Sequence, residues 1–412
     1  MYAGYSGSRI AEENIIRGGW DLKDVDRNIE PQLTKILFSK ASGARIPLSG
    51  TFELSPVCNF SCRMCYVRKS MKEVQEHNRK MLTKDQWIEI AKQARKEGML
   101  YLLLTGGEPF LWPDFWELYE ALNRMGFVIT INTNGSLIDE TAVRRLTEMP
   151  PTRINITLYG ASDETYESMC QVKGVFSKVD EAIHRLRSAG IVVKLNGSLT
   201  PQNVGDLKAC AEYAEQHNLI YETNTYMFPP LRRDSGSIGV NQRFTPEEAA
   251  RYNAESYRLL YGDKFYWKRM EAIVKGAIPP PGLDEGCIDP LDGKVRCRAG
   301  KASFWITWDG WMTPCGMMPE PKIDITKGTF RENWESLTKV SGELKVSGVC
   351  EKCPNQKLCH SCAAMALTET GSTEKIPTYL CEMVKEMKKY AVRELSAKNI
   401  ISKGGKTENE NA

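Results

Sequence analysis

Short apolar runs alternate with longer amphipathic segments over the first half of the chain. A capping box at Thr83–Gln86 and a glycine at Gly98 bound one amphipathic segment, which predicts a helix between them. The apolar runs predict six strands, near residues 52–54, 101–104, 127–132, 153–159, 191–199 and 219–227. Strands that alternate with helices predict an α/β fold with a parallel sheet and right-handed crossovers, curled into a partial (β/α)6 barrel of the TIM type.

The second half of the chain has a different pattern. Thr245 begins a capping box that predicts a helix to about Ile273, and a proline- and glycine-rich stretch at 278–282 predicts a linker. Residues 305–312 predict a hairpin, because Asp309 and Gly310 form a typical turn pair between apolar runs. The predicted units are an N-terminal extension (1–48), the barrel (49–230), a helical linker (231–282), a small cysteine-rich domain (283–400) and a tail (401–412).

Composition and charge exclude several classes of protein. The 412 residues carry a formal net charge of +3, which argues against a strongly basic nucleic-acid platform. The longest apolar run, residues 99–104, is far shorter than the roughly 20 residues of a membrane helix, and residues 1–9 lack the order of a secretory signal. We therefore expect a cytoplasmic protein without nucleic-acid or membrane partners.

The 13 cysteines are the unusual feature of the composition. In a reducing compartment, clustered cysteines indicate metal ligands rather than disulfides. Cys58, Cys62 and Cys65 form a C-x3-C-x2-C run, whose three thiolates can hold one iron–sulfur cube and leave its fourth iron without a protein ligand. A zinc site is the alternative, and it needs a fourth ligand, for which the nearest histidine is His77. Two further cysteines, at 170 and 210, stand alone in helical patterns and indicate small buried apolar residues.

Other unusual local features fall where the predicted strands end. They are Gly106-Gly107-Glu108-Pro109, Asn134, Thr157 and Asn196. Parallel barrels place their chemistry at the carboxyl ends of the strands, and two adjacent glycines let the backbone approach a ligand closely. An ordinary turn is the alternative interpretation of the glycine pair.

Together, the C-x3-C-x2-C loop and the Gly-Gly-Glu-Pro motif resemble those of the radical S-adenosylmethionine superfamily. The resemblance covers about 230 residues and implies that Cys58, Cys62 and Cys65 hold a catalytic 4Fe–4S cluster. It implies that this cluster binds and reductively cleaves S-adenosylmethionine, giving a 5′-deoxyadenosyl radical that abstracts hydrogen. Met64 stands where many members carry an aromatic residue, and its sulfur can pack on adenine. The cofactor-binding residues expected on this basis are Met64, Tyr66, Gly106, Gly107, Glu108, Pro109, Asn134, Thr157 and Asn196.

The later cysteines resemble the SPASM extension of peptide-modifying radical enzymes. Cys297, Gly310 and Cys315 fit the first part of its pattern, while Cys359 and Cys362 are one residue closer than is common. The resemblance implies two auxiliary 4Fe–4S clusters and therefore three clusters in all. The first would be held by Cys297, Cys315 and Cys362 with Cys287 as candidate fourth ligand, and the second by Cys350, Cys353, Cys359 and Cys381. A single four-cysteine zinc ribbon at 350–362 is the alternative.

Several functions fit these features. The first is a maturase that builds a thioether or carbon–carbon cross-link into a ribosomally made peptide under anaerobic conditions. A sulfatase maturase that makes formylglycine is the second, but Gly316 replaces the aspartate base that this subfamily carries. Dehydrogenation of a small molecule is the third, and a non-enzymatic electron carrier has no use for the barrel motif.

Partners follow from the same resemblance. They are a precursor peptide, an electron donor of the flavodoxin or ferredoxin type, and a separate leader-recognition protein, because residues 1–47 lack the pattern of a winged-helix recognition domain. Arg232 and Arg233 follow the sixth predicted strand and are candidates for binding a substrate carboxylate or peptide carbonyls. A solvated charge pair is the alternative for these two arginines.

Overall fold

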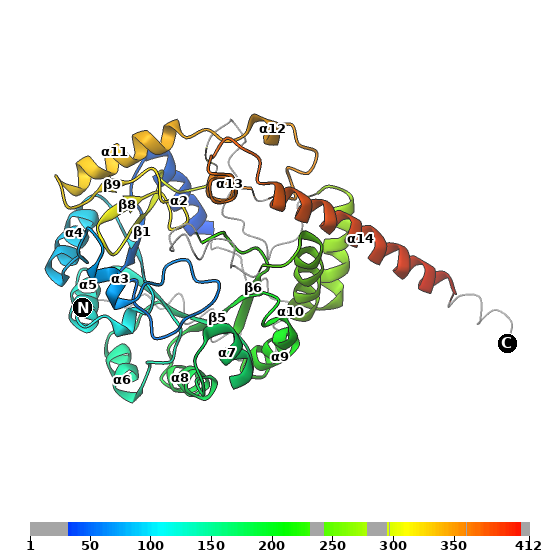
Figure 1. Ribbon diagram of the computed structural model, residues 1–412, viewed down its shortest axis with the longest axis horizontal. Helices are drawn as coiled ribbons and strands as arrows, with labels where there is room; N and C mark the ends of the chain where they lie inside the picture. Colours follow the sequence, from blue (N-terminus) through cyan, green and yellow to red (C-terminus); the bar gives the residue numbers. More distant parts are fainter. Residues whose placement is uncertain (1–31, 231–242, 278–294, 296, 360, 405–412) are drawn as a thin grey trace.

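A curved parallel sheet forms the centre of the protein, which is described here by a computed structural model covering residues 32–230, 243–277, 295, 297–359 and 361–404 (Figure 1). The six predicted strands are all present, and they pair in parallel in the order of the chain. They are β1 (Ser49–Glu53), β2 (Tyr101–Thr105), β3 (Val128–Thr133), β4 (Arg153–Thr157), β5 (Val193–Ser198) and β6 (Ile220–Asn224). The expected α/β partial barrel is thus confirmed.

Helices cover the convex side of this sheet, as Figure 1 shows for α4 to α9. Their apolar faces and the alternate strand residues form one large core that includes Trp87, Phe115 and Tyr166. The elements between the strands are α3 (Met71–Gln75), α4 (Lys84–Lys96), η1 (Pro109–Leu111), α5 (Phe115–Arg124), α6 (Glu140–Glu148), α7 (Asp163–Cys170), α8 (Phe176–Ser188), η2 (Val204–Asp206) and α9 (Leu207–Gln216). The capping box predicted at Thr83 is confirmed at the start of α4.

Three strands from the cysteine-rich region extend the same sheet beyond β1. They are β7 (Ser303–Ile306), β8 (Trp311–Thr313) and β9 (Ile323–Asp324). The predicted hairpin is confirmed as the antiparallel pair β7–β8, and Gly310 in its turn has the positive φ of 85° that favours glycine. However, β7 also pairs in parallel with β1, a connection that the sequence did not predict. This pairing gives hydrogen-bond partners to the backbone N–H and C=O groups at the edge of β1, which would otherwise be unpaired.

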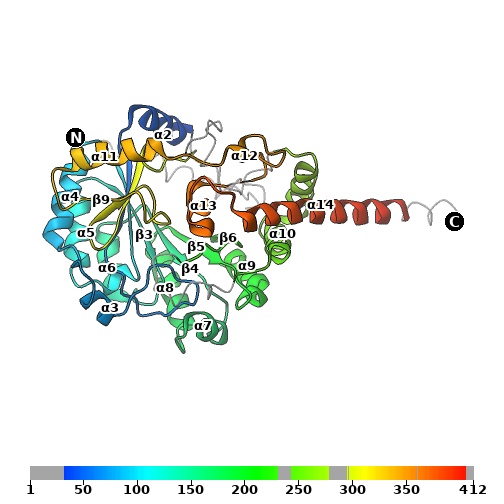
Figure 2. The ribbon, with the colours of Figure 1, turned by 45° about the horizontal axis from the view of Figure 1, so that its top comes forward.

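The remaining helices flank this extended sheet. They are α2 (Gln32–Ala44), α10 (Pro246–Val274), α11 (Phe330–Glu343), α12 (Gly348–Glu351), α13 (Ala363–Thr370) and α14 (Thr378–Gly404). The helix predicted after Thr245 is α10, which packs against α14 in a second apolar core. Turned by 45°, α14 still projects away from the barrel (Figure 2). Within the part of the chain that the structure describes, no helix has the length and apolarity to cross a membrane.

Candidate functional site

The loop that follows β1 carries Cys58, Cys62 and Cys65 to the carboxyl edge of the sheet. Backbone N–H groups already point at two of these sulfurs: Phe60 donates to Cys58 Sγ at 3.3 Å, and Arg68 donates to Cys65 Sγ at 3.3 Å. Such N–H···S bonds orient thiolates and stabilise their charge in iron–sulfur sites. Burial raises the pKa of the Cys58 thiol to about 12, so binding to a metal, rather than ionisation alone, would be needed to make this cysteine a thiolate.

A neighbouring helix holds the middle of the cysteine loop. The backbone N–H groups of Ser61 and Arg63 donate to the carbonyls of Cys170 and Met169, at 2.9 and 3.1 Å, at the end of α7. The Cys170 thiol also hydrogen-bonds Cys62 and thereby lowers the pKa of that cysteine. The expectation that Cys170 is a buried apolar residue is therefore incomplete, because it supports a candidate ligand. No sequence pattern could have indicated this, since 108 residues of chain separate the two cysteines.

The glycine pair after β2 packs against the cysteine loop itself. A Cβ atom on Gly107 would lie 2.4 Å from the carbonyl oxygen of Val57, and one on Gly106 would lie 2.4 Å from that of Ser55. Two backbone hydrogen bonds join the same segments, from Gly107 N to Ser55 O and from Glu108 N to Val57 O. The expectation that the glycines leave space for a ligand was incomplete, because the side-chain space is taken by the backbone that leads into Cys58.

Glu108 turns its side chain into the protein. Its carboxylate is fully buried and accepts hydrogen bonds from Thr133 Oγ1 at 2.8 Å, Asn134 N at 2.8 Å and Phe110 N at 3.1 Å. Burial raises its pKa to about 7, although these three donors oppose the shift. Glu108 thus links the ends of β2 and β3. Because its side chain is occupied in this way, any ligand at this motif would have to be contacted by backbone groups.

The other predicted cofactor residues surround the cysteine loop or face the concave side. Asn134 is buried and donates to Asn59 Oδ1 at 2.9 Å and to Cys58 Sγ at 3.7 Å, so the structure brings it to the first cysteine. Thr157 and Asn196 are paired in register on β4 and β5. Both are half-buried and alternate with core residues, which places them on the concave side. The half-buried Met64 and Tyr66 remain within the cysteine loop, and Pro109 is buried at the start of η1.

Three cysteines distant in sequence meet beside the segment that follows β6. Cys297, Cys315 and Cys362 share one apolar cluster with Phe228. Cys315 lies near enough to the other two for their charges to act on it, and burial raises its pKa to about 12. Met365 N donates to Cys362 Sγ at 3.4 Å at the start of α13. This is the trio expected for the first auxiliary cluster, and its candidate fourth ligand, Cys287, lies outside the described residues.

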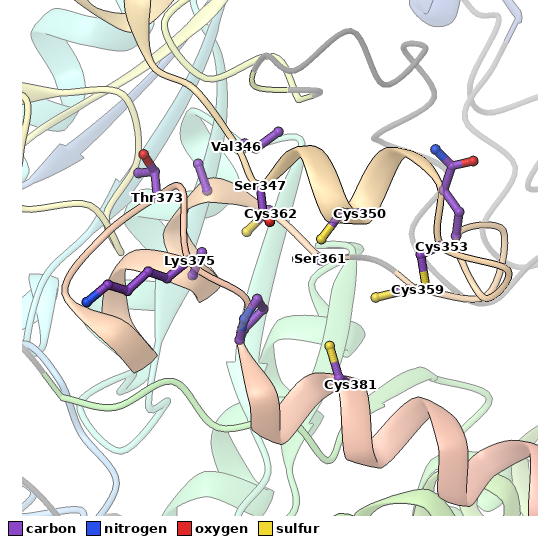
Figure 3. A pocket seen from close by; sticks show the side chains of 14 residues that line it. Val346, Ser347, Cys350, Cys353, Cys359, Ser361, Cys362, Thr373, Lys375 and Cys381 are labelled. Carbon is purple, nitrogen blue, oxygen red and sulfur yellow. The ribbon is translucent and has the colours of Figure 1, made fainter.

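A second group of cysteines lines a cavity between α12, α13 and the start of α14 (Figure 3). Its members are Cys350, Cys353, Cys359 and Cys381, and Cys362 of the first group lines the cavity as well. The side chain of Cys381 points into the cavity from α14 in Figure 3. Burial raises the pKa of Cys359 to about 11, and the charge of Cys381 adds to that effect. These are the four ligands expected for the second auxiliary cluster. All four are free thiols, and their soft sulfur donors fit an iron–sulfur cluster.

An open cleft lies between residues 67–77, which follow the cysteine loop, and the hairpin β7–β8. Its lining includes Lys69, His77, Trp308, Asp309 and Lys322. Sequence reasoning missed this cleft, because its two walls are more than 200 residues apart. Arg232 and Arg233, the predicted substrate-binding residues, lie outside the described residues.

Gly316 lines the cleft and packs against an indole ring. A Cβ atom at this position would lie 2.9 Å from three ring atoms of Trp305. Trp305 Nε1 in turn donates to Glu53 Oε2 at 2.9 Å, and Glu53 is fully buried at the end of β1. A side chain at 316 therefore requires Trp305 to move.

The sequence and the fold are similar to those of known proteins. Residues 52–214 match the Radical SAM superfamily. A probable GTP 3',8-cyclase of Saccharolobus solfataricus is 34% identical over 286 residues, which are 68% of this chain and 87% of that protein. The AdoMet-dependent heme synthase of Methanosarcina barkeri is 24% identical over 78% of this chain and 92% of its own. The mycofactocin maturase MftC of Mycobacterium ulcerans is 25% identical over 80% and 86%.

Two solved structures share the fold over most of their length. One is Streptococcus suis SuiB bound to its precursor peptide SuiA, with a TM-score of 0.62 and 16% identity, covering 91% of this chain and 88% of that one. The other is anSMEcpe with bound AdoMet and the Cp18Cys peptide, with a TM-score of 0.64 and 21% identity, covering 86% and 99%.

Proposed function

Because this chain belongs to the radical SAM superfamily, we propose that it is a peptide maturase of that superfamily. Its substrate would be a ribosomally made precursor peptide, and its product a thioether or carbon–carbon cross-link. The observation that carries this proposal is the cleft between residues 67–77, which follow the cysteine loop, and the hairpin with the segment after it, up to Lys322. A chain segment lying in this cleft would contact the residues just after the cysteine loop on one side and the hairpin on the other.

Three cysteine groups would hold three 4Fe–4S clusters. Cys58, Cys62 and Cys65 would hold the catalytic cluster, and this cluster with S-adenosylmethionine would supply a radical that abstracts hydrogen. The two auxiliary groups have their cysteines gathered beside Phe228 and in the cavity of Figure 3. Backbone groups of Gly106 and Gly107 would contact the methionine end of the cofactor, since the side chain of Glu108 is turned inward. A flavodoxin- or ferredoxin-type protein would supply the electron.

The cleft walls offer the groups that bind a peptide. Lys69 and Lys322 carry positive charge that can bind carboxylates or carbonyls, and Trp308 and Trp311 provide indole rings beside them. Lys322 already lies 4.9 Å from the centroid of the Trp311 ring and contacts Glu320 at 2.6 Å. We therefore expect these lysines to position the peptide, and the radical to act on it at the concave face of the sheet.

The geometry at Gly316 favours cross-linking over formylglycine formation. The indole ring of Trp305 occupies the space that an aspartate base at this position would need. The similarity in fold to anSMEcpe does not supply the aspartate base, because the presence of that base depends on the residue at position 316 alone.

The test is a reaction with candidate precursor peptides, taken from any small open reading frame found beside the gene, under anaerobic conditions with a chemical reductant. We expect a product lighter by two hydrogens per cross-link and an equal amount of 5′-deoxyadenosine, measured by tandem mass spectrometry. Loss of sulfur from a cysteine-containing sulfatase peptide would instead identify a formylglycine-generating enzyme. Cofactor cleavage without any change in the neighbouring peptides would point to a small-molecule substrate.

Substitutions of the two cleft lysines distinguish an effect on peptide binding from an effect on the chemical step. Lys69→Ala and Lys322→Ala should each raise KM for the peptide by about tenfold, the loss of one charge-assisted contact, and change kcat little. Lys327→Ala is the matched control, because Lys327 is 83% exposed and pairs with Asp324 outside the cleft. Equal KM values in all three variants would show that the peptide binds elsewhere.

A further inference from the structure

Two of the four histidines in the chain meet on the outer side of the barrel, away from every cysteine group. His184 lies on α8, and His217 is the C-terminal cap of α9, the helix beside it in Figures 1 and 2. Asp180 precedes His184 by one helical turn, so both side chains are on the same face of α8. One ligand atom from each of the three residues lies within 4.8 Å of the others.

The contacts in this group hold the side chains toward one another. His184 Nε2 lies 3.3 Å from Asp180 Oδ1, and the two imidazole rings meet edge to face with centroids 4.7 Å apart. Tyr213 donates from its hydroxyl to Asp180 Oδ1 at 2.6 Å, and its ring lies 4.4 Å from that of His217. The carboxylate is thereby oriented by a neighbouring hydrogen bond, as supporting residues do for metal ligands.

The donors are suited to a borderline divalent ion. Two imidazole nitrogens and one carboxylate oxygen are the ligands that zinc binds in sites with an open fourth position. An ion with bonds of about 2.1 Å needs ligand atoms about 3.4 Å apart, so small rotations of these side chains would close the group around it. The side chains of His184 and Asp180 are 50% and 34% exposed, which leaves a path for the ion to enter.

Electrostatics favour a neutral imidazole ring at His217. Partial burial and the neighbouring charge of His184 lower the pKa of His217, with Arg187 adding to the shift and Asp180 opposing it. A neutral imidazole is the form that binds a metal. Arg187 also repels a cation, a cost that the carboxylate of Asp180 offsets.

We propose that Asp180, His184 and His217 form a binding site for one divalent transition-metal ion of the zinc class, which joins α8 to α9 on the outer side of the barrel. We call it the α8–α9 site. It is separate from the iron–sulfur chemistry, because its donors are nitrogen and oxygen rather than thiolate sulfur. An ion bound there would stabilise the folded protein by linking two helices that belong to successive strand–helix units.

Cobalt(II) is the probe, added to the protein with its iron–sulfur clusters already assembled so that the cluster cysteines are occupied. We expect one equivalent to bind, with visible d–d absorption and without the near-ultraviolet absorption of a cobalt–thiolate bond. Zinc should displace it in a one-to-one competition and raise Tm. Unchanged absorption of the clusters checks that no iron is displaced.

Substitutions of the proposed ligands and of their neighbours test the α8–α9 site. His184→Ala and His217→Ala should each weaken cobalt binding more than about tenfold and remove the zinc-dependent rise in Tm. Tyr213→Phe should weaken binding by about tenfold through the loss of the bond to Asp180. His77→Ala and Glu181→Gln should bind as the wild type does, since neither residue belongs to the group. Failure of the wild type to bind one equivalent, or binding that survives in both histidine variants, would overturn the proposal.

Discussion

Trp305 Nε1 donates a hydrogen bond of 2.9 Å to Oε2 of Glu53, across 252 residues of chain. Glu53 is the last residue of β1, just before the cysteine loop, and Trp305 lies on β7, just before the turn of the hairpin. The two strands pair in parallel, so this bond adds a side-chain connection to the backbone one. The start of the cysteine loop is therefore joined to the hairpin that leads to Cys315.

This connection predicts coupled effects at Trp305 and Gly316. Gly316→Ala should destabilise the protein by about 2 kcal/mol, because the new methyl group meets the Trp305 ring. In a Trp305→Leu background the same change should cost much less, since the ring is gone. Unfolding by denaturant of the two single variants and the double variant measures the coupling, and additive effects would contradict the contact.

A second prediction concerns the glycine that packs on the cysteine loop. Gly107→Val should displace Val57 and lower the iron content by one cluster, because its Cβ would lie 2.4 Å from the Val57 carbonyl oxygen. Iron analysis and S-adenosylmethionine cleavage measure both effects. Gly205→Val is the control, since nothing lies within 4 Å of a Cβ there. A variant that keeps all its iron and loses only cofactor binding would contradict this account.

The cysteine groups predict how iron is distributed. The reconstituted protein should contain about twelve irons in three 4Fe–4S clusters. Replacing Cys58, Cys62 and Cys65 by Ala should remove about a third of the iron and abolish cofactor cleavage. Replacing Cys350, Cys353 and Cys381 should remove a similar share from the cavity of Figure 3. Cys210→Ala is the control, and about four irons in the intact protein, or stoichiometric zinc, would refute the assignment.

Glu108 predicts a dependence of stability on pH. Its pKa is about 7 in the folded protein and near 4.5 when exposed, so the folded state holds the proton more tightly. Its contribution to stability is therefore full below about pH 4.5 and falls as the pH rises to 7, by on the order of 3 kcal/mol. Anaerobic denaturation between pH 5 and 8 should show this slope in the wild type and in Glu148→Gln, but not in Glu108→Gln. Parallel curves for wild type and Glu108→Gln would exclude the effect.

The contacts of Arg79 predict that replacing it by lysine lowers the stability of the protein. Its guanidinium binds both carboxylate oxygens of Asp324, at 2.9 and 2.8 Å, and donates to the carbonyl of Asp309 at 2.7 Å. Arg79→Lys should lose about 2 kcal/mol of stability, because an ammonium group cannot make this set of planar contacts. Arg331→Lys, at a more exposed pair with Glu97, should change stability by less than about 0.5 kcal/mol. Equal effects in both variants would refute the role of Arg79.

Local patterns in the sequence predicted the elements but not the contacts between distant ones. The capping boxes at Thr83 and Thr245, and the alternation of apolar runs with helices, depend on neighbouring residues and therefore appear in the sequence. The parallel pairing of β7 with β1 joins segments about 250 residues apart, and no local pattern records it. The same is true of the hydrogen bond between Cys170 and Cys62.

In the candidate site, too, local patterns were predictable from the sequence and contacts between distant segments were not. Spacing and family resemblance indicated which cysteines belong together, and the structure gathers Cys297 with Cys315 and Cys362 as expected. The orientation of Glu108 could not be predicted, because it depends on donors from the next strand, Thr133 and Asn134. The reason for two glycines in the motif was likewise visible only once Val57 and Ser55 were in place.

The place of β7 in the sheet has a consequence for protein synthesis. While the ribosome makes residues 54–302, the outer edge of β1 has no partner, because the strand that covers it has not yet been translated. A nascent chain in that interval presents an uncovered sheet edge beside the cysteine loop, and such edges pair with other chains. Chains truncated before residue 303 should therefore aggregate. Cluster insertion into a properly closed catalytic loop should also wait until translation has passed the hairpin.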